Sequence, residues 1–292
     1  MKKKFLGMVA FVVGIMLVVA FAGCDGGNSN GNQNDAKLIF SEDFNGTSLD
    51  TAKWNVCPNL DRQGRSTWMD DMVSVSGGYL HIKFRRDAAL GATKPTEPEI
   101  ASNWIRAGGI RTRSKDWQKI LFQNTFGYYE ARIKFPQISG VWGAFWLMSP
   151  TVDQDLTNGG EEGTEIDIVE SIDNRINGYN AALHWNGYGE EYHQSVTSGN
   201  NYNTVPVGIY DGEFHTFALY WTPSEYIFYV DDYEFWRVDG GPNFQNCGIN
   251  RKPNYIKLTV ESAPWAGNIP ACFTEAEMVV DYVRVYDRPP QK

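Results

Sequence analysis

Short runs of apolar or alternating residues, separated by Gly, Pro and Asn, recur from Phe40 to the end of the chain. Side chains on a β-strand alternate between its two faces, so runs of this length and pattern are typical of strands. Aromatic residues make up 14% of the sequence, and long stretches of helix-forming residues at helical spacing are absent. The pattern predicts an all-β sandwich of antiparallel sheets. The runs are MVSVSGGYLHIKF, FGYYEARIKF, VWGAFWLM, HTFALYW, YIFYVDDYEFWRV, YIKLTV and MVVDYVRVY.

One of these runs contains its own turn. YIFYVDDYEFWRV predicts a β-hairpin that reverses at Asp231 and Asp232. After Lys37 the sequence shows no internal repeat, no linker and no change of composition. We therefore expect one folded domain over residues 37–288.

The N-terminus is built differently. MKKKFLGMVAFVVGIMLVVAFAGC has a basic start, an apolar stretch and a small-residue end, and it resembles a bacterial lipoprotein signal whose Cys24 is lipidated after cleavage. A membrane-spanning helix of marginal length is the alternative. Residues 24–36 contain almost no apolar side chain and predict a flexible tether. We expect residues 1–23 to be the signal peptide, and the domain to be exported and anchored to the cell envelope, at the cell surface or in the periplasm.

The remaining charges and cysteines give weaker constraints. A formal net charge of −9 argues against a broad basic surface for nucleic acid. Cys57, Cys247 and Cys272 allow at most one intramolecular disulfide, and the sequence does not establish which pair, although Cys247 with Cys272 would close the shorter loop. No C-x-x-C or His-x-His cluster suggests zinc.

Three carboxylates stand close together in EIDIVE. Glu165 and Asp167 share one strand face, whereas Glu170, five positions from Glu165, should face the other way. One extra residue in a β-bulge near Ile168 or Val169 would return Glu170 to that face. A calcium site or an exposed acidic strand is the alternative.

Two carboxyl groups held on one sheet face are the apparatus of a retaining glycosidase. One attacks the anomeric carbon, and the other protonates the leaving oxygen and later deprotonates water. Repulsion between them raises the pKa of the group that must stay protonated.

EIDIVE resembles the bulged E-x-D-x-x-E signature of glycoside hydrolase family 16. Other stretches are similar to the same family, from roughly Lys37 to Asp287: FSEDFNGTSLDTAKW, YYEARIKFPQISGVWGAFWLM, FHTFALYWTPSEYIFYVDD and VDYVRVYD. The resemblance implies a β-jelly-roll of two curved antiparallel sheets with an open cleft on the concave face. It also implies that Glu165 is the nucleophile, Glu170 the general acid/base, and Asp167 an assisting carboxylate.

The same resemblance suggests substrate-binding residues. Trp142 and Trp146 share a strand face in VWGAFWLM and would present sugar-stacking platforms about 13 Å apart, given the rise of a strand. Both match Trp positions of the family, and His184 matches a family His beside the cleft, while Trp185 is expected in the core. Gly143 stands where many relatives have Pro. YIKLTVESAPWAG also departs from the family pattern, so Trp265 could be a platform of a subgroup, and NAALHWNGYGEEYHQS cannot be assigned to one polysaccharide.

Relatives of this kind often bind a structural calcium ion on the convex face. Asp43, Gly78 and Asp281 match the ligand positions, with Gly78 contributing its backbone carbonyl. Oxygen ligands from distant segments would tie the two ends of the domain together. The alternative is that these residues are solvated or cap turns.

The combined expectation is a monomeric, lipid-anchored endo-β-glycanase that needs no cofactor for catalysis and acts on a polysaccharide. A β-1,3- or mixed-linkage β-1,3-1,4-glucan is the leading substrate. An endo-β-galactanase acting on agar-like or mucin-type chains is the alternative enzyme. A glycan-binding lectin is the alternative from another class, although the presence of Glu165 and Glu170 argues against it.

Overall fold

Two β-sheets form most of the chain. The computed structural model describes residues 35–172, 178–199, 207–240 and 247–291. The predicted signal peptide, Cys24 and all but the last two residues of the predicted tether lie outside the described residues. Within the described ranges, no helix has the length and apolar character needed to cross a bilayer.

The first sheet carries the predicted carboxylates. Its seven strands run in the order β13-β12-β11-β10-β17-β8-β2, and all its pairings are antiparallel. The bounds are β2 (Asn55–Val56), β8 (Gly109–Arg111), β10 (Val141–Met148), β11 (Thr164–Glu170), β12 (Asn180–Trp185), β13 (Gln194–Thr197) and β17 (Tyr255–Ser262).

The second sheet has eleven strands in the described part of the chain. They run in the order β16-β15-β14-β9-β18-β6-β7-β4-β3, with β1 paired to β18 and β5 to β6. Among the pairings of these described strands, only β4–β7 is parallel. The bounds are β1 (Leu38–Glu42), β3 (Asp61–Arg62), β4 (Ser66–Trp68), β5 (Val73–Ser76), β6 (Tyr79–Arg86), β7 (Ile105–Ala107), β9 (Gly127–Lys134), β14 (His215–Trp221), β15 (Tyr226–Val230), β16 (Tyr233–Val238) and β18 (Glu275–Tyr286).

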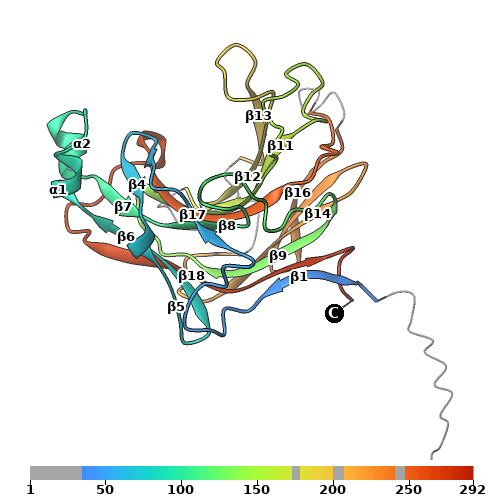
Figure 1. Ribbon diagram of the computed structural model, residues 1–292, viewed down its shortest axis with the longest axis horizontal. Helices are drawn as coiled ribbons and strands as arrows, with labels where there is room; N and C mark the ends of the chain where they lie inside the picture. The colour runs from blue at the N-terminus through green and yellow to red at the C-terminus, as the bar shows by residue number, and fades with distance from the viewer. Residues whose placement is uncertain (1–34, 173–177, 200–206, 241–246, 292) are drawn as a thin grey trace, which may run out of the picture. The chain divides into compact units, whose positions relative to one another are not determined.

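Helices are few and short. The α-helices α1 (Ala88–Gly91) and α2 (Pro98–Ser102) lie beyond one end of the sheets (Figure 1). Two 3-10 turns, η1 (Asp70–Met72) and η4 (Pro264–Ala266), complete the labelled elements. The architecture confirms the predicted all-β jelly-roll sandwich.

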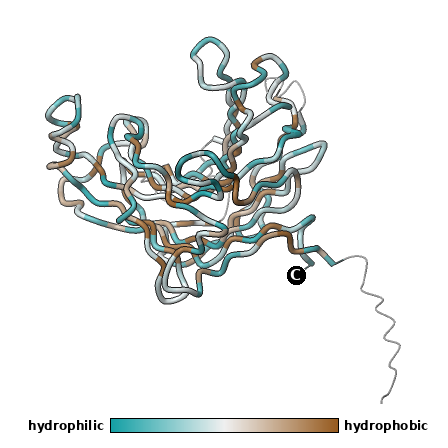
Figure 2. Tube along the Cα trace, viewed as in Figure 1, coloured by the Kyte–Doolittle hydropathy of each residue, from teal (hydrophilic) through white to brown (hydrophobic). Residues whose placement is uncertain are grey.

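The core lies between the two sheets, where the apolar side chains of the strands meet. Hydrophobic residues recur along the strands that enclose it (Figure 2). Alternation along the strands decides which residues enter it. On β17, for example, Ile256, Leu258 and Val260 are completely buried. The intervening side chains of β17 therefore face the other side of the sheet, which becomes the cleft.

Two sequence predictions about local structure are confirmed. Asp231 and Asp232 both have left-handed φ values, 45° and 67°, and connect β15 to β16 as a two-residue hairpin turn. Trp185 is completely buried, as expected. Cys57, Cys247 and Cys272 are free thiols, the first two buried and the third exposed.

The packing around Gly143 explains why this position holds a glycine. A Cβ at this position would lie 2.8 Å from the Phe135 ring and 2.9 Å from the sulfur of Met278. Both side chains belong to the packed interior behind β10, so a larger residue would have to displace them. The packing of Phe135 and Met278 therefore explains why glycine, and not the proline of many relatives, stands at position 143.

Candidate active site

A β-bulge in β11 brings the three carboxylates together. On the neighbouring strand β10, Phe145 lies opposite Val169 and Trp146 lies opposite Asp167, so Ile168 has no partner. Ile168 and Val169 are both completely buried. The extra residue turns Glu170 back to the face of Glu165 and Asp167, as the sequence predicted.

These carboxylates line a cleft of about 890 Å³. Its floor is the outer face of β10, β11, β12 and β17, whose opposite face packs into the core. Loops and the β3–β4 hairpin supply its walls. The volume falls within the range typical of ligand pockets. The cleft-facing residues of the four strands are Trp142, Ala144, Trp146, Met148, Glu165, Asp167, Glu170, Asn180, Ala182, His184, Tyr255, Lys257, Thr259 and Glu261.

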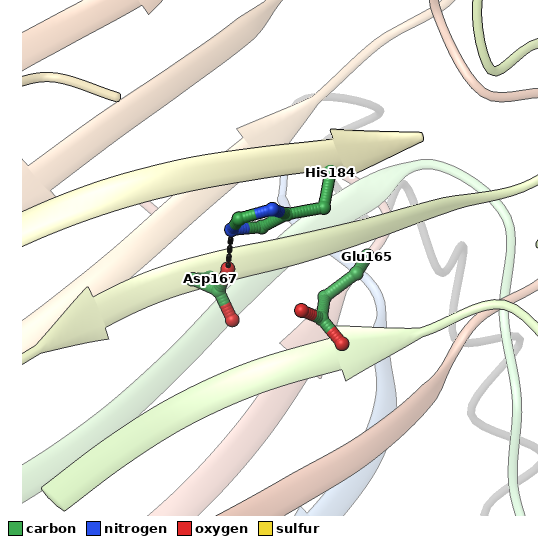
Figure 3. Close-up of side chains that lie close together, drawn as sticks. All are labelled: Glu165, Asp167 and His184. Carbon is green, nitrogen blue, oxygen red and sulfur yellow. Dashed lines mark ion pairs between the residues drawn. The ribbon is translucent and has the colours of Figure 1, made fainter. Parts of the chain in front are cut away.

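Each carboxylate has a polar partner. The Tyr188 hydroxyl donates a hydrogen bond of 2.6 Å to Oε2 of Glu165, and the Asn180 amide donates one of 2.9 Å to Oε2 of Glu170. Asp167 lies between them, with Oδ2 3.5 Å from Nε2 of His184 (Figure 3). Each of the three carboxyl groups in the cleft is therefore oriented by a different partner residue.

Burial dominates the proton affinities of the site. It raises the pKa of Glu170 to about 7, and the negative charges of Glu165 and Glu261 add to this, while the Asn180 hydrogen bond partly opposes it. Burial also raises the pKa of Glu165, against which the Tyr188 hydrogen bond and the charges of Lys257 and Arg62 act. A carboxyl group that still holds its proton near neutral pH is suited to general acid catalysis.

The proton affinity of Asp167 is also perturbed. Burial raises its pKa well above the ordinary value, and the charges of Glu165 and Glu170 on either side raise it further. The protonated form of Asp167 is therefore favoured while its neighbours are ionised. It can then donate a hydrogen bond to them, which agrees with an assisting role.

His184 is neutral in this site. Burial lowers the pKa of His184 to about 4, and the nearby His193 acts in the same direction. Its Nδ1 lies 3.1 Å from Nε2 of His193. A neutral imidazole has one donor nitrogen and one acceptor nitrogen. With Nε2 facing Asp167, the consistent tautomer donates from Nε2 and accepts at Nδ1 from His193.

The tryptophans line the cleft as predicted, but they are not equivalent platforms. Trp142 and Trp146 are each only 6% exposed, whereas Trp265 is 54% exposed. Trp265 packs on Trp142 with 4.3 Å between ring centroids and 47° between planes. The ammonium of Lys257 lies 3.5 Å from the centroid of Trp146 and covers one face. Of these three tryptophans, Trp265 therefore has the open ring, and Trp142 supports it.

The sequence analysis did not single out the polar residues on β17. Lys257 and Glu261 are almost completely buried on the cleft side of this strand. Burial lowers the pKa of Lys257 to about 8, so the group still carries its charge at neutral pH. No described residue accepts a hydrogen bond from its ammonium. The alternation in YIKLTVES was the signal that could have placed these side chains in the cleft.

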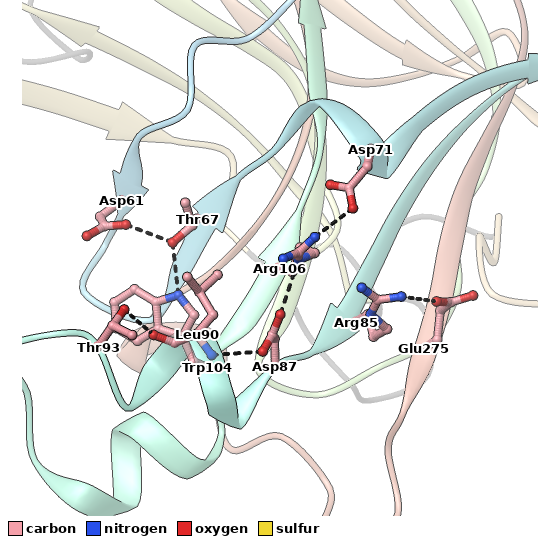
Figure 4. Close-up of polar contacts among 10 residues, drawn as sticks. All are labelled: Asp61, Thr67, Asp71, Arg85, Asp87, Leu90, Thr93, Trp104, Arg106 and Glu275. Carbon is pink, nitrogen blue, oxygen red and sulfur yellow. Dashed lines mark hydrogen bonds and ion pairs between the residues drawn. The ribbon is translucent and has the colours of Figure 1, made fainter.

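The β3–β4 hairpin closes one end of the cleft. Arg62 forms an ion pair with Glu261, with 3.2 Å between Nε and Oε1, and so joins the hairpin to β17. Thr67 holds the hairpin from behind. Its hydroxyl donates to Asp61 at 2.7 Å and accepts from Nε1 of Trp104 at 3.0 Å (Figure 4). Arg62 is thereby fixed at the cleft wall.

The predicted calcium ligands are ion-paired in the structure. Asp43 lies 2.9 Å from Nη2 of Arg284, and Asp281 lies 2.5 Å from Nη1 of Arg132. Gly78 has a left-handed φ of 84° in the turn before β6. A calcium ion would compete with two arginines for these carboxylates.

The active-site groups themselves have a spacing that a cation could bridge. One donor atom from each of Glu165, Asp167 and His184 lies within 4.8 Å of the others. The hydrogen bonds and proton affinities of the carboxyl groups are equally consistent with acid–base and nucleophilic chemistry.

A jelly-roll sandwich whose cleft holds clustered carboxyl groups among aromatic side chains is typical of one class of protein, the glycoside hydrolases. Within this class, the chain belongs to glycoside hydrolase family 16. Residues 37–288 match the family model described as beta-porphyranase A-D, GH16 domain.

Individual relatives differ in what they are named for. The chain is 28% identical over 264 residues to the keratan-sulfate endo-1,4-beta-galactosidase of Sphingobacterium multivorum. The alignment covers 87% of this chain and 56% of that enzyme. The chain thus spans little more than half of that enzyme's length. It is 24% identical over 300 residues to the beta-glucanase of Rhodothermus marinus, covering 97% of this chain and 96% of that enzyme.

A solved structure supports the fold. The endo-beta-1,3-glucanase from Pyrococcus furiosus superposes with a TM-score of 0.67 at 23% identity, covering 88% of this chain and 96% of that one. This likeness confirms the jelly-roll architecture.

Proposed function

We propose that this chain is a retaining endo-β-glycanase in which Glu165 is the nucleophile and Glu170 the general acid/base. The observation that carries the proposal is the bulge in β11. It places both carboxyl groups on the cleft face, in surroundings that raise the pKa of Glu170 to about 7. Glu165 has a hydrogen-bond donor and two nearby cations that favour its ionised form.

The reaction follows from these states in two steps. In the first, an oxygen of Glu165 bonds to the anomeric carbon while Glu170 gives its proton to the departing sugar oxygen. In the second, Glu170 takes a proton from water, the water oxygen bonds to the same carbon, and Glu165 leaves. Two displacements at one carbon return the original β configuration.

For the substrate, we infer a β-galactan in preference to a β-glucan. The matching family model is a porphyranase model, and a relative at 28% identity is named for keratan sulfate, a sulfated chain. The cleft supports this choice with a specific group: the buried ammonium of Lys257 faces the cleft without a described hydrogen-bond acceptor. Such a cation suits an anionic substituent on the sugar. This reverses the order of preference that the sequence suggested.

A β-1,3- or mixed-linkage β-glucan is the second candidate. The relative that matches over nearly its whole length is named a beta-glucanase. The open indole of Trp265 beside the cleft suits the flat face of either sugar and does not distinguish them.

A substrate panel tests both inferences together. Reducing-end release would be measured on porphyran, agarose, keratan sulfate, mucin, laminarin and barley β-glucan. We expect fastest release from a galactan, and faster release from the sulfated than from the desulfated form of the same chain. Preference for laminarin or barley glucan would overturn the galactan inference. Binding to a chain without cleavage of any would favour the lectin alternative.

We also propose that the chain is exported and lipid-anchored through Cys24. The support is the basic, apolar and small-residue pattern of residues 1–23 followed by a polar tether. Partition of the full chain into a detergent phase, lost on Cys24→Ala, would be the expected behaviour. An unchanged partition would count against the anchor.

A structural calcium ion remains a proposal as well. If Asp43, Asp281 and the carbonyl of Gly78 bind calcium, adding the ion should raise the melting temperature and a chelator should lower it. The arginine partners of both aspartates predict weak binding. Asp43→Asn should remove the calcium dependence. A melting temperature indifferent to calcium and chelator would show that these acids only form ion pairs.

A further inference from the structure

The loop after β12 is shaped to reach the active site. Its sequence, NGYGEEYH, begins with Asn186 and Gly187, both left-handed, with φ values of 61° and 69°. A Cβ on Gly187 would lie 2.7 Å from Oδ1 of Asp153, so this position requires glycine. The Gly187 amide donates to the carbonyl of Val152 at 3.0 Å. This anchored turn delivers Tyr188 to the cleft.

Tyr188 contacts the nucleophile directly. Its hydroxyl donates the 2.6 Å hydrogen bond to Oε2 of Glu165. The residue lies at the edge of the cleft and is 49% exposed. The ring stacks on His193, with 5.6 Å between centroids and 24° between planes. Among the described residues, Tyr188 is the one that donates a hydrogen bond to the Glu165 carboxylate. A short hydrogen bond to an ionised carboxylate is among the stronger kinds.

The other end of the loop supports the second carboxylate. His193 lies nearly parallel to His184, with 6° between the ring planes, and the two share the 3.1 Å contact between nitrogens. His184 in turn faces Asp167. One loop therefore reaches both Glu165 and Asp167 from the same side, through Tyr188 and through His193.

We propose that Tyr188 is a positioning residue for the nucleophile, braced by His193. By holding Oε2, it leaves Oε1 of Glu165 as the attacking oxygen and keeps the carboxylate ionised in a buried site. The proposal rests on the proposed function, because the role concerns the retaining reaction. It also gives a use to the stretch that the sequence analysis could not assign.

The surrounding charges explain why such a donor is needed. Ionised Glu165 is disfavoured by burial, and favoured by cations that make no hydrogen bond to it in the described structure. Burial and the charge of Glu165 raise the pKa of Tyr188, so the phenol keeps its proton and remains a donor. The titratable groups that face Glu165 are Asp167 and Glu170 from β11, His184 from β12, Lys257 and Glu261 from β17, Arg62 from β3, and Tyr188 and His193 from the loop.

Tyr188→Phe tests the role, since it removes only the hydroxyl and keeps the ring on His193. Below neutral pH we expect about a tenfold loss of kcat/KM, because losing this hydrogen bond raises the pKa of Glu165 by about one unit. The acidic limb of the pH profile should move to higher pH by the same amount. Tyr192→Phe is the matched control, because Tyr192 lies in the same loop, is 44% exposed and does not line the cleft. It should leave the profile unchanged.

A second measurement does not depend on turnover. In protein labelled with ¹³C at the glutamate carboxyl carbons, the Glu165 signal, assigned with Glu165→Gln, should titrate at higher pH in Tyr188→Phe than in wild type. An unchanged Glu165 titration would overturn the positioning role even if activity fell. A shifted titration in a protein inactive on every polysaccharide would leave the hydrogen bond supported and overturn the proposed function instead.

Discussion

Glu165→Gln is expected to reduce polysaccharide hydrolysis by about four orders of magnitude or more, because no carboxylate remains to form the glycosyl-enzyme bond. The amide has nearly the same shape and can still accept the hydrogen bond from Tyr188. Oligosaccharide affinity should therefore stay close to that of wild type. Reducing-end release and calorimetric titration on the same preparation would measure the two quantities.

Asp167→Asn is the comparison for this variant. We expect Asp167 to assist the nucleophile without forming the covalent bond itself, so its loss should slow turnover less completely than loss of Glu165. Equal losses in the two variants would argue against separate roles. Loss of affinity together with activity in a folded Glu165→Gln protein would contradict the nucleophile assignment.

Glu170→Ala is the second change with a large expected effect. Hydrolysis of polysaccharide should fall by about 10²- to 10⁴-fold, the usual contribution of general acid–base catalysis, because a sugar leaving group needs a proton. An aryl glycoside with an acidic phenol leaves without that help, so the intermediate should still form on Glu165. Water would attack it slowly without a base, and the intermediate should accumulate.

Azide and pH provide two further readouts of Glu170→Ala. Azide needs no general base, so it should restore turnover and give a β-glycosyl azide. The wild-type enzyme should lose activity as pH rises through about 7, where Glu170 gives up its proton, and this limb should disappear in the variant. An α-azide, or a β-azide from Glu165→Ala instead, would mean that the roles or the stereochemistry are reversed.

Local sequence patterns predicted the part of the site that lies on one strand. The spacing of Glu165, Asp167 and Glu170 can be satisfied on one face only if the strand contains an extra residue, and the register between β10 and β11 contains it at Ile168. Alternation likewise placed Trp142 and Trp146 on one strand face, and the resemblance to the family assigned that face to the cleft. Residue spacing and alternation within one strand can be read from a short stretch of sequence.

Contacts between strands could not be predicted in the same way. Trp146 lies opposite Lys257 and Trp142 opposite Glu261 because of the β10–β17 register. That register joins segments more than a hundred residues apart, and no local pattern specifies it. The sequence therefore predicted Trp146 as an open platform, whereas a lysine ammonium covers one of its faces.

The loop after β12 shows a related limit. Asn186 and Gly187 mark a turn in the sequence, but the side chain that the turn delivers depends on where β12 ends relative to β11. The pairing of His184 with Glu165 brings Tyr188 within reach of the nucleophile. The role of Tyr188 became visible only once that pairing was known.

The configuration of the first product tests the retaining mechanism most directly. Proton NMR would follow wild-type enzyme acting on its preferred polysaccharide, and would record the anomeric signal of the new reducing end before mutarotation. We predict that the β anomer appears first and the α anomer grows in later. Initial release of the α anomer would mean a single displacement by water, and would contradict the assignment of Glu165 as nucleophile.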